Sequence, residues 1–319
     1  MNTKNKSNMI HISRIYDAPV AIVWDAWTDL EQVAQWWGPR GFTITTHSKD
    51  LRVGGIWHYT MHGPDGTDYP NKTKYYDVVE KSRLVYDHGG YDDRAPLFRV
   101  TADFKENQGK TRMDLTFTFA TPEVAIEMGL FIKAAGGNAT WDRLAEFLSH
   151  EIAQREVFVI NRSFDAPIDL VFSMWSDPQH LATWLAPTGS NMTFYKSDIR
   201  EGGETFYSMM NDQYILYGRT NYLEIKKPTR MVYTQQFCDK DQNMARHPMA
   251  PTWPETMLTT VEFNSEFDGG TRVTVTWEVY GECSREELET FVQARGGMTQ
   301  GWTGSFDKLD EALLKLSAA

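Results

Sequence analysis

Few residues of this 319-residue chain are placed where they could catalyse a reaction. Asp87, His88 and Asp103 could approach the mouth of a pocket and act there as a general acid and a general base. Side chains of this kind are more often charges on the rim of a pocket, so we assign no catalytic residue. The sequence favours a protein that is not an enzyme, with an enzyme kept as an alternative.

The histidines and cysteines do not form a metal-binding pattern. His58 and His62 share one face of a predicted strand, but that face is opposite to Trp57 and Tyr59, so both imidazoles should be solvated. No His-Glu-x-x-His, paired Cys-x-x-Cys or Gly-x-Ser-x-Gly motif occurs, and the Gly-Gly pairs do not form a phosphate-binding loop. We therefore expect no metal site, no nucleotide site and no cofactor.

Composition and charge restrict the partners and the compartment. The formal net charge of −11 opposes binding to nucleic acid or to an anionic membrane surface. No stretch approaches the roughly 18 apolar residues of a membrane helix, and the polar start has no apolar run of the signal-peptide type behind it. We expect a cytoplasmic protein whose two cysteines, Cys238 and Cys283, are reduced thiols.

The elements that position any site are repeated once along the chain. Residues 14–19, with the sequence Arg-Ile-Tyr-Asp-Ala-Pro, return as Arg-Ser-Phe-Asp-Ala-Pro at 162–167, an offset of 162 − 14 = 148 residues. The same offset places Trp27 on Trp175 and Trp36 on Trp184. Solenoid repeats are only about 20–50 residues long, so each copy should have its own core. We predict two domains, 9–150 and 156–315.

Each copy should begin with one strand and two short helices. Residues 8–16 alternate in polarity as a strand does, and Asp17-Ala18-Pro19 indicates a helix start capped by the aspartate carboxylate. Val20, Val23, Trp24 and Trp27 then follow at helical spacing, and a second helix should run from about Asp29 to Trp36.

The remainder of each copy predicts a sheet and a closing helix. Residues 42–119 are strand-like, with Trp57, Tyr59 and Met61 on one face of one strand, and turn signals separate about six antiparallel strands. Trp141, Leu144 and Leu148 have helical spacing, which predicts a long helix at the end of the copy. A sheet with one apolar face needs a cover, and this helix is the available one.

Several motifs together resemble a known family. They are the Asp-Ala-Pro start, Asp29 followed by Trp36-Trp37-Gly38-Pro39, Val53-Gly54-Gly55 before an aromatic strand, and the segment 301–309. They look like the activator of heat-shock-protein-90 ATPase homologue group of the START-like, or SRPBCC, superfamily, which is Bet v 1-like. The resemblance implies an α+β class: two tandem helix-grip domains, each a curved antiparallel sheet wrapped on a long C-terminal helix with two short helices.

The helix-grip fold implied by the resemblance holds an elongated cavity between sheet and terminal helix. Aromatic and methionine side chains on the inward faces would line it, because large rings bury area and their polar atoms then find partners. Filling of a solid core is the alternative for each of them. The candidate ligand-binding residues are Trp57, Tyr59, Tyr86, Phe98, Phe117 and Trp141 in the first copy and Tyr207, Met209, Tyr233, Phe237, Trp277 and Phe306 in the second.

The two copies differ in two places that bear on this cavity. Trp37-Gly38 of the first copy is replaced by Leu185-Ala186 in the second. The second copy also carries twelve extra residues around 244–254, a segment with three prolines. We predict that this segment covers the second cavity as a lid, with Trp253 or Met249 against the ligand, whereas a surface excursion is the alternative.

These observations support three functions in order. The first is non-enzymatic binding of a small hydrophobic or aromatic molecule in a cavity of each domain. The second is an enzyme of the polyketide cyclase or hydrolase type. The third, implied by the resemblance alone, is a chaperone partner role in which the chain stimulates a heat-shock-protein ATPase.

Overall fold

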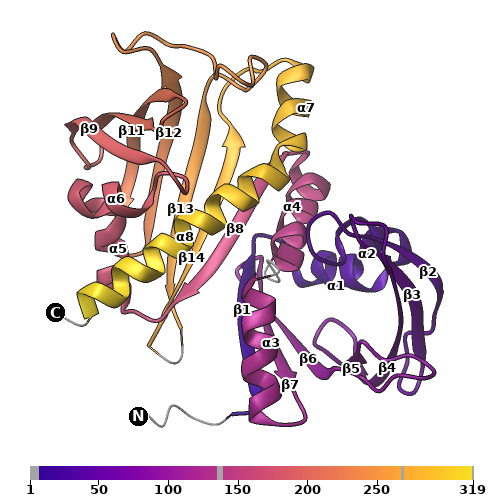
Figure 1. Ribbon diagram of the computed structural model, residues 1–319. Helices are drawn as coiled ribbons and strands as arrows, with labels where there is room; N and C mark the ends of the chain where they lie inside the picture. Colours follow the sequence, from indigo (N-terminus) through magenta and orange to yellow (C-terminus); the bar gives the residue numbers. More distant parts are fainter. Residues whose placement is uncertain (1–6, 135–138, 267–268, 318–319) are drawn as a thin grey trace. The chain divides into compact units, whose positions relative to one another are not determined.

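The computed structural model describes residues 7–134, 139–266 and 269–317 (Figure 1). The chain divides into two compact units, Met1–Gln154 and Arg155–Ala319. Within the described ranges, none of the helices has the length and apolar character needed to cross a membrane.

The first unit is a seven-stranded antiparallel sheet with four helices among the described residues. Its sheet order is β1-β7-β6-β5-β4-β3-β2, so the first strand joins the last one and the remaining strands follow as a meander. The elements are β1 (Met9–Tyr16), α1 (Val20–Thr28), α2 (Leu30–Trp36), β2 (Thr43–Lys49), β3 (Ile56–His62), β4 (Asp68–Val79), β5 (Arg83–His88), β6 (Phe98–Asn107), β7 (Lys110–Thr118), α3 (Pro122–Ala134) and α4 (Ala139–Ala153).

The second unit repeats this order of elements. Its sheet order, β8-β14-β13-β12-β11-β10-β9, is that of the first unit strand for strand, and α8 lies across one face of the sheet (Figure 1). The elements are β8 (Val157–Phe164), α5 (Ile168–Ser176), α6 (Pro178–Trp184), β9 (Asn191–Ser197), β10 (Glu204–Met210), β11 (Ile215–Lys226), β12 (Arg230–Cys238), β13 (Met257–Ser265), β14 (Thr271–Val279), α7 (Arg285–Gln293) and α8 (Arg295–Ser317). The predicted α+β class with tandem helix-grip domains is confirmed.

The starts of the short helices agree with the sequence in part. The second helix was expected from about Asp29, and Asp29 is its cap: its carboxylate accepts hydrogen bonds from the backbone of Glu31 and Gln32, both at 3.0 Å. The predicted cap by Asp17 is wrong. Helix α1 begins at Val20, so its N-cap residue is Pro19 and not Asp17. Pro19 makes no side-chain hydrogen bond to the start of the helix. The free N–H of Val20 instead donates to the Glu106 carboxylate at 2.8 Å.

The closing helices cover the apolar face of each sheet. Trp141, Leu144 and Leu148 of α4 are buried, and Phe306, Leu309 and Leu313 of α8 occupy the same role in the second unit. Sequence analysis missed the helix that precedes each closing helix. For α7 a usable signal exists: Ser284 and Glu287 form a capping box three residues apart. The core of each unit therefore lies between its sheet and a helical layer.

Candidate functional site

The second unit holds a half-open cavity of about 280 Å³. Strands β10 to β14 form its sheet side, α8 lies opposite, and the β12–β13 loop closes one end. Ligand pockets in proteins begin near roughly 300 Å³, so the space suits a small organic molecule. The lining residues are Leu185, Pro187, Tyr207, Met209, Leu216, Tyr217, Gly218, Tyr233, Gln235, Gln236, Phe237, His247, Trp253, Pro254, Glu255, Met257, Trp277, Met298, Gly301, Trp302 and Ser305.

Most of the residues singled out in the second copy meet at this cavity. Its lining includes six of them: Tyr207, Met209, Tyr233, Phe237, Trp253 and Trp277. Phe306 lies beside it in the core, where its ring centroid is 5.2 Å from that of Trp302. Met249 is 75% exposed and does not line the cavity, because its part of the loop points to solvent. Whether these side chains contact a ligand remains a prediction.

The space itself depends on small residues that sequence analysis did not select. A Cβ atom on Gly218 would lie 2.5 Å from the Tyr207 ring, so only glycine allows this ring to lie across β11. The first unit has Asn71 at the corresponding place of β4, opposite Tyr59. Gly301 on α8 likewise keeps the helix side of the cavity free of a side chain. A comparison of small residues between the two copies could have found both positions.

The polar groups of the cavity are uncharged or already paired. Burial raises the pKa of the Tyr207 and Tyr233 phenols, so both are neutral near pH 7. Burial lowers the pKa of His247, which favours the neutral imidazole. The carboxylate of Glu255 accepts a hydrogen bond from Arg246 at 2.9 Å. A ligand with its own net charge would find no unpaired countercharge among the lining residues.

The β12–β13 loop is attached to α7 by side chains. Arg246 donates to the Trp253 carbonyl at 2.7 Å and forms ion pairs with Glu255 and with Glu287 of α7. The ring of Trp253 packs edge-on against Phe291 of α7, with centroids 5.9 Å apart. Trp253 thus contacts α7 and lines the cavity at the same time, and the role of the loop as a lid stays a prediction.

The corresponding interior of the first unit is filled with tryptophan. Trp37, at the position of Leu185, has ring centroids 5.2 Å from Trp57, 6.5 Å from Tyr59 and 6.2 Å from Trp141. Trp57 and Tyr59 stack at 4.1 Å, and Trp141 stacks on Trp27 at 5.5 Å. All of these side chains are at most 6% exposed. Three candidate residues of the first copy, Trp57, Tyr59 and Trp141, thus all contact the ring of Trp37.

A half-buried arginine, Arg143, binds the segment that carries Trp37. Arg143 of α4 donates to the carbonyls of Gly38 at 2.9 Å, Pro39 at 3.0 Å and Phe42 at 3.1 Å. Burial, together with the nearby charge of Arg40, lowers the pKa of Arg143 to about 10. The remaining candidates of the first copy lie nearby: Tyr86 is buried, and Phe98 packs on Phe117 at 5.3 Å.

Comparison with known families decides the relationship. The family model described as "Activator of Hsp90 ATPase homolog 1-like protein" matches residues 17–149 and again 165–314. The chain belongs to this family. The resemblance seen in the sequence is confirmed for both copies.

Solved structures resemble one unit at a time, and no curated protein matches the chain. A protein from Arthrobacter aurescens is 27% identical, covers 47% of this chain and 91% of its own, and has a TM-score of 0.43. A protein from Mycobacterium smegmatis is 23% identical, covers 49% of this chain and 90% of its own, and has a TM-score of 0.42.

The residues weighed for acid–base chemistry do not converge in this family member. Asp87 accepts hydrogen bonds from Arg99 at 2.9 Å and Tyr76 at 2.7 Å, while Asp103 is paired with Arg83 at 2.7 Å. His88 points to the other face of β5 and stacks on Phe98 at 5.0 Å. Because neighbours on a strand point to opposite faces, Asp87 and His88 cannot act together.

The histidines of β3 lie on the outer face of the first sheet. His62 contacts Asp68 and Thr45, at 2.6 and 2.9 Å, and the ring centroid of His58 is 4.5 Å from that of His47. Across the described residues, no cluster of three or more histidine, cysteine or acidic side chains could hold a metal ion.

Proposed function

We propose that the second unit binds a small, uncharged hydrophobic or aromatic molecule without converting it chemically. The observation that carries this proposal is the cavity of about 280 Å³, whose lining is mainly aromatic and aliphatic. Neutral phenols and amides supply hydrogen bonds there without charge. Asp87 pairs with Arg99 while His88 stacks on Phe98, an arrangement that supports binding over acid–base catalysis.

The position of Leu185 offers a direct test. Leu185→Trp places the first copy's tryptophan at the cavity wall, whereas Leu185→Met nearly conserves the volume and serves as the control. Native mass spectrometry of freshly purified parent protein should show a bound small molecule, unchanged in mass from the free compound. The Leu185→Trp variant should lose it and the Leu185→Met variant should retain it. Equal occupancy of parent and Leu185→Trp protein would place the ligand elsewhere.

The first unit is included in the proposal as a weaker site. Three of its candidate residues, Trp57, Tyr59 and Trp141, pack against Trp37, so a ligand between them would have to displace that ring. The other three candidates are Tyr86, Phe98 and Phe117. We therefore expect the second unit to bind first in a titration. Binding with equal affinity at two sites in the parent protein would contradict this order.

A chaperone partner is the second candidate, because the matching family is described by its relation to the Hsp90 ATPase. Addition of the chain to a purified heat-shock-protein-90 ATPase should then raise the rate of ATP hydrolysis. The Leu185→Trp variant separates the two functions, since it fills an interior cavity and leaves the surface unchanged. Stimulation by both proteins would favour the chaperone role, and no stimulation by either would exclude it.

A further inference from the structure

A second, much smaller chamber adjoins the cavity of the second unit. Its volume is about 20 Å³, which is the space of roughly one water molecule. Leu185, Tyr207, Tyr233 and Gln235 line both spaces, so the chamber and the cavity are direct neighbours. The small chamber is thus positioned to receive one atom or group from whatever occupies the larger one.

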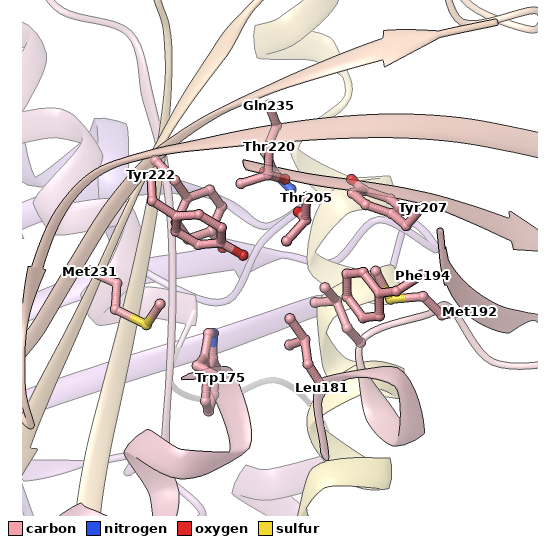
Figure 2. Close-up of a pocket in the computed structure, with 12 residues that line it drawn as sticks. Trp175, Leu181, Met192, Phe194, Thr205, Tyr207, Thr220, Tyr222, Met231 and Gln235 are labelled. Atoms are coloured by element: carbon pink, nitrogen blue, oxygen red, sulfur yellow. The ribbon is translucent and has the colours of Figure 1, made fainter. Parts of the chain in front are cut away.

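The chamber contains a hydrogen-bond donor without an acceptor. The indole nitrogen of Trp175 is buried and has no partner, and the side chain is only 2% exposed. Figure 2 shows this nitrogen at the end of the ring that points into the chamber. A buried donor without a partner costs about 1–3 kcal/mol, so an oxygen atom in front of it would be stabilising.

The other polar groups of the chamber are hydroxyls and one amide. Thr205, Thr220 and Tyr222 face it from neighbouring strands, together with Gln235 (Figure 2). Burial raises the pKa of the Tyr222 phenol, an effect that Thr205 partly offsets. The twelve lining residues include no arginine, lysine, histidine or carboxylate. A neutral oxygen is therefore favoured over a carboxylate, which would be buried without a countercharge.

The first unit differs at the residue that creates this space. Trp57 stands where Thr205 stands in the second unit, and its ring occupies the region between Trp37 and Tyr59. Trp27, the counterpart of Trp175, also has a buried indole nitrogen without a partner. The donor is thus common to both units, whereas the chamber in front of it is lined by the smaller Thr205 only in the second.

We propose that this chamber is a binding subsite for a neutral oxygen, a hydroxyl or a carbonyl, at one end of a hydrophobic ligand. Trp175 donates to that oxygen, and the ligand's apolar part lies in the larger cavity. The inference rests on the proposed binding function and adds the chemical class: a hydrophobic molecule with one uncharged polar end. A fully apolar molecule would leave the Trp175 donor unpaired.

Three probes of similar size test the subsite by equilibrium dialysis against the full chain at pH 7. They are 2-naphthol, 2-methylnaphthalene and 2-naphthoate. The parent protein should bind 2-naphthol about five- to tenfold more tightly than 2-methylnaphthalene, as one net hydrogen bond allows. The anion 2-naphthoate should bind least tightly. In Trp175→Phe and Thr205→Trp variants, the preference for 2-naphthol should fall to about twofold or less.

Trp27→Phe is the matched control, because it removes the equivalent donor from the first unit and leaves the chamber unchanged. It should keep the parent's preference. Thr205→Trp places the first unit's ring in the chamber and leaves the Trp175 donor in place, so it decides the result even where Trp175→Phe perturbs folding. If 2-naphthol and 2-methylnaphthalene bind the parent equally, the subsite is wrong and the binding function stands. If neither binds the parent, the binding function fails and the subsite fails with it.

Discussion

Replacement of Trp37 by leucine should convert the first unit into a cavity-containing domain. Trp37 is 5% exposed and its ring contacts those of Trp57, Tyr59 and Trp141. Truncation of a buried tryptophan to alanine costs about 3–5 kcal/mol, and leucine retains part of the packing. We expect Trp37→Leu to lower the free energy of unfolding of the first unit by about 3 kcal/mol.

The assay is differential scanning calorimetry of the full chain with and without ligand. For a unit of this size, a loss of about 3 kcal/mol corresponds to a fall in Tm of roughly 6–12 °C. Addition of 2-methylnaphthalene should recover part of this fall, because a ligand that binds only the folded state raises its stability. The Leu185→Met variant is the control and should melt within about 2 °C of the parent.

One result would refute the reasoning. If Trp37→Leu costs less than about 1 kcal/mol and gains no affinity for 2-methylnaphthalene, the neighbouring rings collapse into the vacated space. The difference between the two units would then not depend on this position. Loss of stability without ligand binding would instead show that Trp37 is needed for packing and that leucine alone does not open a pocket.

Three further predictions concern the lid, pH and the domain boundary. Trp253→Ala should weaken ligand binding to the second unit about tenfold or more, because it removes a ring that lines the cavity and contacts Phe291. Equilibrium dialysis should show unchanged binding to the first unit. Burial lowers the pKa of His88 from 6.5 to about 4. As the pH falls, the unfolded chain therefore takes up a proton at His88 before the folded chain does. The free energy of unfolding should fall between about pH 6.5 and pH 4, by on the order of 3 kcal/mol. His88→Gln, which copies Gln235 of the second unit, should remove this dependence in urea titrations. Fragments 1–152 and 155–319 should each melt cooperatively when expressed alone, and two fragments without a transition would show that the copies depend on each other.

The prediction of the fold succeeded because the signals were repeated. The strand, the two short helices, the sheet and the closing helix appear twice with the same hydrophobic periods, so each pattern supports the other. The start of α2 was placed within one residue because its cap, Asp29, bonds only to Glu31 and Gln32 beside it in the sequence. Asp17 was misjudged because the start of α1 depends on Glu106, a residue 86 positions away from Val20.

The prediction of the site was less complete because a cavity is an absence of side chains. The inward direction of Tyr207, Tyr233 and Trp277 follows from strand alternation, and all three line the cavity. Nothing in that alternation says whether rings meet each other or leave a space. Whether a space is left depends on single positions such as Gly218, where a Cβ atom would clash with the Tyr207 ring.

The sequence by itself determined that two α+β domains follow one another and which faces of their strands and helices are apolar, since these properties are periodic and local. Only the tertiary structure decided that the second unit has a cavity while Trp37 and Trp57 fill the first. It also decided that Trp253 faces the cavity and Met249 faces solvent. The physical reason is that packing depends on the summed volumes of side chains from distant segments, and no single segment carries that sum.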